Sequence, residues 1–372
     1  MKKNRLLLID GNSIINRAFF ALPPMDNGQG LHTNAIYGFL TMLFKMIKNY
    51  EPSHISVAFD MKAPTFRHKS YTEYKAGRKK MPGELAMQLQ PLKDVLDKMN
   101  IDRQEIEGYE ADDILGTLSL DAEKEGYEVY IVTGDRDAIQ LASEKTRVLI
   151  TKKGVGEVEE YDAKAVMERY SLTPDQFIDL KGLMGDKSDN IPGIPGIGEK
   201  TGIKLLLEYK TVQGVLDNVD KLKGAQKKKV EENMESALMS KDLATIFREV
   251  PLDYSLDQMA FGDFSMEDLV KTFQDLKFNS LIARLNDLVG QEDQELDIDI
   301  YQLTDFDGFI DQAKDKGHLY MKIFRAEENI LDKAIYMTYL SLESDKIYRV
   351  HGDDIARLKP ILEAEEIEKI GY

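Results

Sequence analysis

The sequence predicts an α/β fold with a mostly parallel sheet, because apolar runs of strand length alternate with longer helical patterns. Four runs rich in Val, Ile and Leu have the composition of strands that are buried on both faces. They cover residues 5–10, 54–60, 127–135 and 146–151. Helical stretches at 35–50 and 84–99 lie between them, which favours helices flanking the sheet.

Composition divides the chain into four predicted regions. Residues 1–165 form the α/β core with a basic segment at 61–83, and residues 166–290 show short helical patterns separated by Gly and Pro turns. Half of the residues in 291–300 are acidic, as in a linker, and residues 301–372 form a smaller α+β segment. In that segment we expect strands at 318–324, 334–342 and 346–350, and a helix at 354–365.

The 372 residues include no cysteine, which excludes disulfides, thiolate catalysis and cysteine-ligated zinc sites. The five histidines do not form a helical zinc-binding motif. The apolar run near the N-terminus stops at Asp10, so it is too short for a signal peptide, and no stretch is long enough to span a membrane. We therefore expect a cytoplasmic protein.

The formal net charge of −17 would argue against a nucleic-acid partner if it were spread evenly. Residues 291–372, however, contain 20 acidic and 10 basic residues and so account for much of this charge. Residues 61–80 carry seven Lys or Arg and one Glu, and residues 200–229 carry eight Lys and three acidic residues. Because the charge is segregated, the basic stretches can still attract a polyanion.

Carboxylates stand at the ends of several predicted strands. Asp10 and Asp60 end the first two strands, and the motif GYEADDILG at 108–116 places three more carboxylates at the start of a helix. Because ligands of open parallel sheets collect at the carboxyl ends of the strands, most of these groups should meet at one edge. The nine candidates are Asp10, Asp60, Glu110, Asp112, Asp113, Asp135, Asp137, Asp186 and Asp189.

Two explanations compete for this cluster. Each carboxylate alone could cap a helix or complement its dipole. Together they would repel one another unless cations lay between them. Oxygen ligands without His or Cys suit Mg²⁺ or Mn²⁺, and two such ions about 4 Å apart could clamp both oxygens of a phosphodiester displacement. The pattern therefore favours metal-dependent hydrolysis of a nucleic-acid backbone.

The basic segment follows Asp60 closely and should lie near the same sheet edge. A solvated loop is one explanation. Interleaved cations and tyrosines instead suit phosphate binding and base stacking on a single strand. The candidates are Arg67, Lys75 and Arg78 for phosphate and Tyr71 and Tyr74 for bases, and Arg17, on the helix after Asp10, could also reach a phosphate.

Residues 189–209 combine a glycine-rich turn with the start of a helix. Free N–H groups at such a helix start can bind phosphate without reading a base. A turn without a ligand is the alternative, but nearby lysines favour phosphate. The candidate contacts are Gly193, Gly196, Gly198, Lys200 and Lys204.

Five motifs in order resemble the 5′-nuclease domain of bacterial DNA polymerase I, in the flap endonuclease superfamily. They are LLLIDGNSIINRAFFALP, VAFDMKAPTFRHKSYTEYKAGR, GYEADDILGTL, VTGDRDAIQL and LMGDKSDNIPGIPGIGEKTG, and the resemblance covers about residues 4–290. It implies a PIN-like core, a helix-three-turn-helix at 189–209 that grips duplex DNA, and two divalent ions, Mg²⁺ or Mn²⁺. In relatives this segment often holds a K⁺ through backbone carbonyls.

The resemblance also implies roles for individual residues. Asp10, Glu110, Asp112 and Asp135 match the central metal ligands. Asp137, Asp186 and Asp189 match a second group, with Asp60 and Asp113 close by, and Arg17, Arg67, Lys75 and Arg78 match positions that hold the scissile region and the 5′ strand. The implied partners are DNA with 5′ flaps, nicks or RNA primers, and the implied setting is a monomer near the bacterial nucleoid.

The tail at 301–372 resembles the start of the polymerase's 3′–5′ exonuclease domain, which has a ribonuclease-H-like topology. Proofreading members carry Asp-x-Glu on the first strand, whereas this chain has Lys322, Ile323 and Phe324 in that region. We therefore expect a degenerate, partial domain without proofreading. Because the sequence stops at Tyr372, where a further strand should continue, we expect a fragment of a longer protein that includes a polymerase domain, with a short natural form as the alternative.

The leading interpretation is a structure-specific 5′ nuclease, acting as 5′–3′ exonuclease and flap endonuclease by two-metal-ion catalysis in replication and repair. A catalytically inactive module that binds flaps or junctions is the main alternative. A PIN-like ribonuclease is a third, and it leaves the long helical half unexplained.

Overall fold

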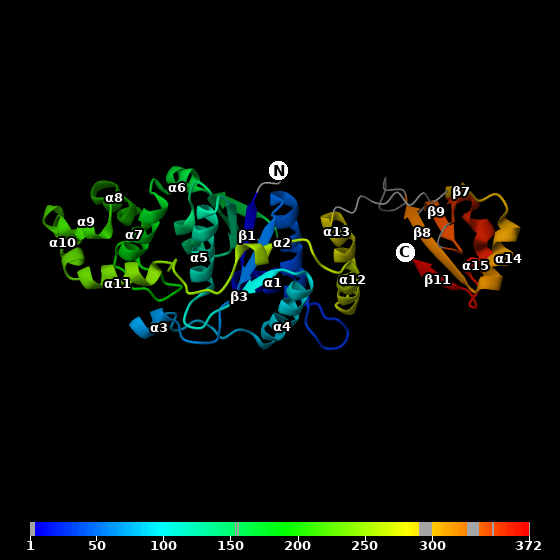
Figure 1. Cartoon of the computed structure of the whole chain (residues 1–372), viewed down its shortest axis with the longest axis horizontal. Helices are drawn as coiled ribbons and strands as arrows, with labels where there is room; N and C mark the ends of the chain where they lie inside the picture. Colours follow the sequence, from blue (N-terminus) through cyan, green and yellow to red (C-terminus); the bar gives the residue numbers. More distant parts are fainter. Residues whose placement is uncertain are drawn as a thin grey trace. The chain divides into compact units, whose positions relative to one another are not determined.

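The computed structural model describes residues 4–152, 154, 156–289, 300–325, 335–343 and 346–371. The chain divides into two compact units, residues 1–289 and residues 290–372 (Figure 1). In the part of the chain that is described, no helix is both long and apolar enough to cross a membrane.

The first unit is built on a six-stranded sheet with the order β3-β2-β1-β4-β5-β6. All neighbours pair in parallel except β6, which is antiparallel to β5. The strands are β1 (Arg5–Asp10), β2 (His54–Ala58), β3 (Asp102–Gln104), β4 (Glu128–Thr133), β5 (Thr146–Thr151) and β6 (Val158–Tyr161). This confirms the predicted α/β core with a mostly parallel sheet.

Strand β1 shows why both faces of the sheet are covered. Its side chains alternate between two apolar clusters: Leu6 and Leu8 join one, and Leu7 and Ile9 join the other. The first cluster includes α5 (Ala111–Lys124), and the second includes α1 (Gly11–Ala21), α2 (Asn34–Tyr50), α4 (Gly83–Lys98), α12 (Met266–Asp275) and α13 (Asn279–Val289). A sheet covered on both sides needs strands that are apolar throughout, as the sequence indicated.

The register sets the position of the acidic edge. Asp10 pairs with Ala58 of β2, and Ile9 pairs with Val132 of β4, so the three strands end at nearly the same level. Because all three run in parallel, the residues that follow them lie along one edge. A 3₁₀ helix (Arg136–Leu141) begins directly after β4.

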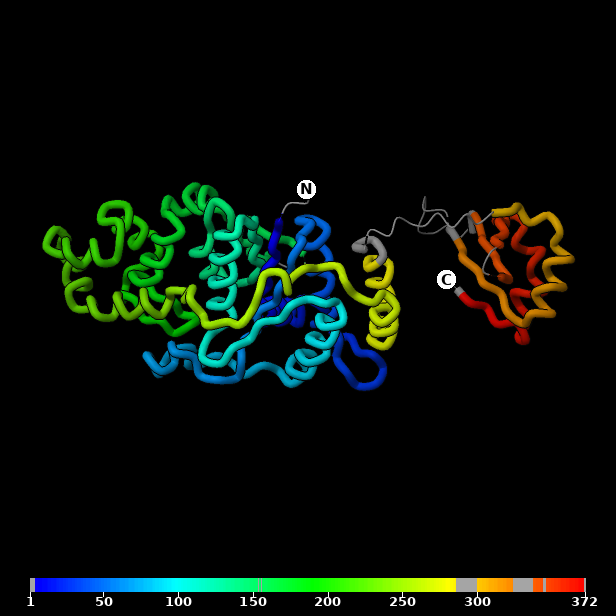
Figure 2. The backbone as a smooth tube through the Cα atoms, viewed as in Figure 1, coloured from blue at the N-terminus to red at the C-terminus, as the bar shows by residue number. Residues whose placement is uncertain are grey.

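The segment 61–83 joins β2 to α4 along the outside of this unit (Figure 2). It contains one short helix, α3 (Phe66–Ser70), and is otherwise irregular. The chain then passes through the core to a group of helices, drawn in green in Figure 1. They are α6 (Ala163–Tyr170), α7 (Pro174–Met184), α8 (Glu199–Tyr209), α9 (Val212–Asp217), α10 (Gly224–Glu231) and α11 (Met234–Ala244), with a 3₁₀ helix at Val219–Lys221. A further 3₁₀ helix, Leu256–Met259, packs against β2 of the core.

The turn between α7 and α8 depends on two glycines. Gly185 and Gly193 both have positive φ angles, of 70° and 59°, and their backbones lie against each other. A Cβ atom on Gly193 would lie 2.2 Å from the backbone nitrogen of Gly185, so no larger residue fits there. The closed turn brings the acidic residues that follow α7 back toward the core.

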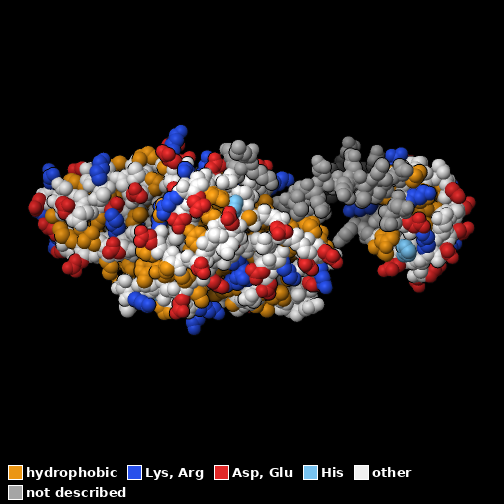
Figure 3. All heavy atoms as spheres, viewed as in Figure 1, with side chains coloured by type: hydrophobic (Ala, Val, Ile, Leu, Met, Phe, Trp, Pro, Cys, Tyr) orange, Lys and Arg blue, Asp and Glu red, His pale blue; other side chains and the backbone are white. Residues whose placement is uncertain are grey.

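The second unit has a five-stranded mixed sheet with the order β11-β8-β9-β10-β7. Its elements are β7 (Ile300–Gln302), α14 (Phe306–Lys316), β8 (His318–Arg325), β9 (Ile335–Ser341), β10 (Ile347–His351), a 3₁₀ helix (Gly352–Leu358), α15 (Lys359–Leu362) and β11 (Glu368–Gly371). Strand β9 is antiparallel to both neighbours, and β11 is parallel to β8. Acidic side chains are spread along much of its visible surface (Figure 3).

Three predicted strands of this unit, β8, β9 and β10, are confirmed, whereas β7, α14 and β11 were not predicted. The predicted helix at 354–365 is instead a 3₁₀ helix followed by α15, which has Pro360 in its first turn. Proline lacks an N–H, so it starts a new helix instead of continuing the preceding one. Of the predicted linker, residues 291–299 lie outside the described residues, and Ile300 begins β7.

Candidate active site

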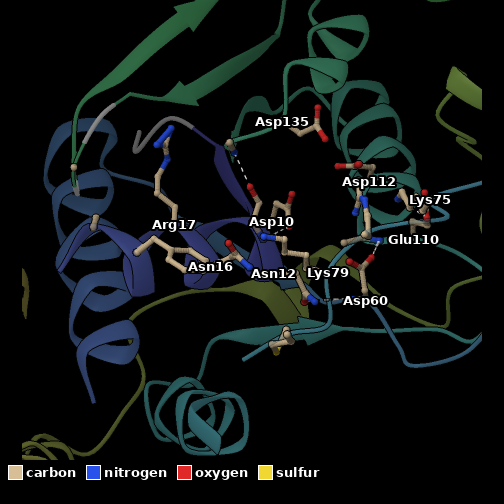
Figure 4. A pocket seen from close by; sticks show the side chains of 18 residues that line it. Asp10, Asn12, Asn16, Arg17, Asp60, Lys75, Lys79, Glu110, Asp112 and Asp135 are labelled. Carbon is tan, nitrogen blue, oxygen red and sulfur yellow. Dashed lines mark hydrogen bonds and ion pairs between the residues drawn. The ribbon is translucent and has the colours of Figure 1, made fainter. Parts of the chain in front are cut away.

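A cleft of about 740 Å³ opens at the carboxyl ends of the central strands (Figure 4). Five of the nine predicted metal ligands line it, together with three of the predicted cations. These acidic residues are Asp10, Asp60, Glu110, Asp112 and Asp135, and these cations are Arg17, Lys75 and Arg78. The described part of the chain thus brings together, from five segments, residues up to 125 positions apart in sequence.

Asp10, Asp112 and Asp135 form what we call the open acidic group, because none of them makes an ion pair within 4 Å among the described residues. Asp10 ends β1, where its Oδ1 accepts from the backbone N–H of Ser13 at 2.9 Å and its Oδ2 accepts from Thr133 Oγ1 at 2.8 Å. Asp135 Oδ1 accepts from the N–H of Asp137 at 2.9 Å and so caps the 3₁₀ helix. Asp112 stands in the first turn of α5.

The open acidic group is electrostatically strained. Burial, followed by the charges of Asp60 and Asp135, raises the pKa of Asp10 to about 7. Burial, followed by the charges of Asp10 and Asp135, raises the pKa of Asp112 well above its ordinary value. Carboxylates that repel one another in this way gain from a cation placed between them.

The donor set fits a divalent cation. Asp112 Oδ1 is buried and has no hydrogen-bond partner among the described residues, which is costly for a carboxylate unless a ligand supplies the interaction. Each carboxylate of the group also offers the hard oxygen ligands that Mg²⁺ and Mn²⁺ prefer. Within the described residues, however, no three acidic or His side chains are already close enough to hold an ion together. Mutual repulsion explains why uncompensated carboxylates stay apart.

A second set of carboxylates, Glu110 and Asp189, is paired with cations of the basic segment. Lys75 Nζ lies 2.6 Å from Glu110 Oε1 and 3.8 Å from Asp189 Oδ2, and Arg78 also pairs with Asp189. The backbone N–H of Lys75 donates to the carbonyl oxygen of Asp189 at 2.8 Å. The basic segment is therefore bound to the loop before α8 by main-chain and side-chain contacts.

Asp113 and Arg67 lie behind the cleft instead of in it. Asp113 is fully buried, and its two oxygens accept from both terminal nitrogens of Arg67, at 2.7 and 2.8 Å, and from the N–H groups of Glu110 and Phe247. Arg67 also donates to the carbonyl oxygens of Leu243 and Thr245. Because these hydrogen bonds occupy both oxygens of Asp113 and the guanidinium of Arg67, the structure does not fit the expectation that Asp113 is a metal ligand and that Arg67 holds the scissile region. Both residues instead join the basic segment to the core.

Asp137 and Asp186 share one lysine that the sequence analysis did not single out. Lys181 Nζ, from α7, lies 2.5 Å from Asp137 Oδ1 and also pairs with Asp186 Oδ2. Asp186 Oδ1 accepts from the N–H of Ser188 at 2.7 Å and from its hydroxyl at 2.6 Å. Neither carboxylate lines the cleft.

The two candidate tyrosines lie differently from the expectation of base stacking. Tyr74 is only 4% exposed, packs with Ile191 and Leu243, and its hydroxyl donates to Glu110 Oε2 at 3.0 Å. Tyr71 is partly buried against the same cluster. A buried ring cannot stack on a base unless the segment moves, so Tyr74 has a packing role in this structure.

The remaining cations and the glycine turn have clear positions. Arg17 Nε donates to Thr151 Oγ1 at 2.6 Å, at the wall of the cleft. Lys200 and Lys204 are exposed, one turn apart, at the start of α8, for which Gly198 is the N-cap. Gly196 is exposed, whereas Gly193 is buried and donates its N–H to Ser240 Oγ at 2.9 Å. Gly193 therefore serves the turn itself and is not free to bind a phosphate.

Sequence reasoning also missed part of the cleft wall. Asn12, Asn16 and Phe20 of α1 line the cleft, and so does Lys79, which is labelled between Asn12 and Asp60 in Figure 4. Asp60 Oδ1 accepts from the N–H of Ala111 at 2.8 Å, which fixes it beside Glu110. These α1 residues could have been predicted from the sequence, because positions 12/13, 16/17 and 20 recur at the helical spacing and so share the helix face that follows Asp10.

Comparison with known proteins identifies the architecture. Residues 5–171 match the 5′–3′ exonuclease N-terminal resolvase-like domain, and residues 172–267 match the 5′–3′ exonuclease C-terminal SAM fold. The DNA polymerase I of Bacillus subtilis is 48% identical over 308 residues, which are 82% of this chain and 35% of the relative. That of Mycobacterium tuberculosis is 43% identical over 290 residues, 77% of this chain and 32% of the relative. The chain thus spans about a third of the length of these relatives.

Solved structures share the fold of the first unit at low identity. The T5 D15 protein co-crystallized with metal ions has a TM-score of 0.54 at 21% identity, over 77% of this chain and 98% of its own. The catalytic core of Rad2 in complex with DNA substrate has a TM-score of 0.53 at 15% identity, over 77% of this chain and 93% of its own.

The two adjacent domain matches cover residues 5–267 without a gap. The chain therefore belongs to the 5′–3′ exonuclease family.

Proposed function

We propose that this chain is a structure-specific 5′ nuclease that hydrolyses DNA phosphodiesters, as 5′–3′ exonuclease and flap endonuclease, with two divalent metal ions, Mg²⁺ or Mn²⁺. The observation that carries this proposal is the open acidic group, three carboxylates without an ion-pair partner among the described residues, in a cleft that also holds Lys75 and Arg17. Family membership supports it. So does the fold shared with a T5 D15 flap endonuclease whose structure contains DNA and metal ions.

In this proposal the open acidic group and Glu110 hold the first ion, and Asp60 stands beside it. Asp137, Asp186 and Asp189 belong to the site of the second ion. Bound divalent ions would lower the pKa of a water molecule and neutralise charge developing on the phosphate. Lys75 Nζ forms an ion pair with Glu110 at the wall of the cleft. If Glu110 held a metal ion instead, the ammonium group of Lys75 would be free to bind a phosphate. Arg17 and Arg78 also line the cleft and would bind flanking phosphates.

The helical part would hold the double-stranded DNA. The turn before α8 and the exposed Lys200 and Lys204 suit binding of duplex phosphates, as in a helix-three-turn-helix. Backbone carbonyl oxygens of this turn would also coordinate a K⁺ ion. The segment 61–83 forms the arch at the 5′ strand. Its irregular course beyond α3 suits a segment that rearranges when DNA binds.

For the second unit we propose a partial, degenerate 3′–5′ exonuclease-like domain of ribonuclease-H-like topology. Three consecutive antiparallel strands, followed by β11 parallel to the first of them, support this topology. This chain covers about a third of the length of the relatives named DNA polymerase I, which supports a polymerase domain in the same protein. DNA with flaps, nicks or RNA primers is the proposed substrate.

The decisive experiment is cleavage of a 5′-labelled flap duplex and a matched single strand, each with Mg²⁺ and with EDTA. We expect Mg²⁺-dependent cutting at the flap junction and little cutting of the single strand. Tight flap binding without cutting in either Mg²⁺ or Mn²⁺ would favour an inactive binding module. A flap with an RNA 5′ segment, compared with an all-DNA flap, would separate this function from that of a ribonuclease.

A further inference from the structure

Lys181 stands at the junction of the two family domains and has no role in the function proposed above. It projects from α7, within the second domain, to Asp137, which follows β4 in the first. Its side chain is only 12% exposed, and the side chains of Asp137 and Asp186 are each 15% exposed. A lysine is rarely this buried unless its charge is matched, so its carboxylate partners hold it there.

One ammonium group serves two carboxylates at this place. Burial lowers the pKa of Lys181, but the charges of Asp137 and Asp186 outweigh it, so the lysine keeps its proton over the working range of pH. With both carboxylates ionised the pair retains an excess of one negative charge, although burial, followed by the charge of Asp135, raises the pKa of Asp137 to about 7. That excess can attract a divalent ion, although less strongly than an uncompensated pair would.

The open acidic group offers the contrast within the same protein. Asp10, Asp112 and Asp135 have no cation within 4 Å among the described residues, whereas Asp137 and Asp186 are already bound by Lys181. A divalent ion that bridges Asp137 and Asp186 has to displace the ammonium group or sit beside it. In either case the binding free energy of the ion is less favourable than it is at the open acidic group, where there is no ammonium group to displace.

We propose that Lys181 is a built-in counter-ion of the second metal site, which weakens divalent-cation binding at Asp137 and Asp186 so that this site fills after the open acidic group. The inference rests on the proposed function, because it assumes that divalent ions are the ligands of these carboxylates. Lys181 is thus a positioning residue that acts on the order of ion binding. In the absence of metal it also keeps the two carboxylates together, and so joins α7 to the core.

The test is to count Mn²⁺ bound to Lys181→Met and to the unchanged protein by electron paramagnetic resonance, without DNA. Methionine keeps the length of the side chain and removes its charge. We expect the weaker of two Mn²⁺ sites to tighten by about ten-fold in this variant, because one repelling charge at close range has gone. Lys181→Gln removes the charge but keeps a hydrogen-bond donor, so it folds more readily and should change the affinity in the same direction.

Two controls separate charge from general damage. Lys181→Arg retains the positive charge and should keep the weak site weak. Lys241→Met breaks the ion pair with Asp179, at 2.8 Å in the same group of helices but away from the cleft, and should leave both Mn²⁺ affinities unchanged. Thermal unfolding gives a second readout: Mn²⁺ should raise the melting temperature of Lys181→Met more than that of the unchanged protein.

The outcomes are distinct. Unchanged or weaker Mn²⁺ binding by both neutral variants, with ions bound at the open group, would overturn the role of Lys181 and leave the nuclease proposal intact. Absence of bound Mn²⁺ from the unchanged protein and from every variant would contradict the proposed function and the role of Lys181 together.

Discussion

The acidic cleft has two sides that differ in how their charge is neutralised. On one side Asp10, Asp112 and Asp135 have no ion-pair partner among the described residues and repel one another. The other side includes residues behind the cleft, and there five carboxylates are paired with Arg67, Lys75, Arg78 or Lys181, namely Glu110, Asp113, Asp137, Asp186 and Asp189. Carboxylates that look alike in sequence therefore have different surroundings: those of one side require a cation from solution, and those of the other side already have one. Asp137 keeps part of the same strain as the open side, because burial and the charge of Asp135 raise its pKa to about 7.

The strongest test of this difference is Asp135→Asn. We expect cleavage of a flap duplex to fall by about 10³-fold or more, because an ion at the open group supplies several kcal/mol of charge stabilisation. Flap binding should change little, since most proposed DNA contacts lie elsewhere. Single-turnover rates and binding measured in Ca²⁺ would separate the two quantities.

The matched control is Asp121→Asn, on the outer part of α5, where Asp121 bonds to Lys124 and Tyr254 and does not line the cleft. It should cleave normally. Undiminished turnover of Asp135→Asn at saturating Mg²⁺ would show that Asp135 is not a metal ligand. It would also contradict the proposed difference between the two sides.

Asp113→Asn should have the opposite character and act on stability. It removes the carboxylate that accepts from both terminal nitrogens of the buried Arg67 and leaves Glu110, at 3.3 Å, as a weaker charged partner, which costs about 3 kcal/mol of unfolding free energy. Asp135→Asn should instead stabilise the metal-free protein, because it removes repulsion from Asp10 and Asp112. Urea unfolding in EDTA compares the two variants directly. Equal changes of the same sign would show that the two sides do not differ as described.

Lys75→Ala tests whether a paired cation also serves the chemistry. We expect the single-turnover rate at saturating enzyme to fall by about 10²-fold, as when one stabilising donor is removed from a reacting centre. Flap affinity should fall less. If only affinity changes, Lys75 acts as a DNA contact and its pairing with Glu110 is structural.

The sequence predicted the framework of this comparison well. Strands β1 and β5 have the predicted bounds, and α2 and α4 differ from prediction by one residue at their ends. Such elements are specified locally, by apolar periodicity and by turn residues, and can be read without knowing their partners. The convergence of Asp10, Asp112 and Asp135 also followed, because strand ends in a parallel sheet share an edge.

The partners of the carboxylates could not be predicted in the same way. Arg67 pairs with Asp113 across 46 positions and reaches Thr245 across 178, and Lys181 meets Asp137 across 44. Nothing in the local pattern of FRHKS or DLKGLM indicates which cation turns inward, since burial of a charge is decided by tertiary packing. The sequence therefore predicted which residue types gather near the cleft. It did not predict which carboxylates pair with an internal cation and which remain open to solvent or to a metal ion.

The smallest effect expected is that of Tyr74→Phe. The ring packs with Ile191, Leu243 and Ala244, and only its hydroxyl reaches the paired side of the cleft, at Glu110 and Asp189. Phenylalanine keeps the packing and any capacity to stack on a base, so the change isolates the hydrogen bonds. We expect a loss of about 1 kcal/mol in unfolding free energy and nearly unchanged flap binding. Tyr71→Phe, at a more exposed ring of the same segment, is the control and should change stability less. If Tyr74→Phe left stability unchanged, the hydroxyl would not help to hold the basic segment against the loop before α8, and ion pairs alone would account for that contact.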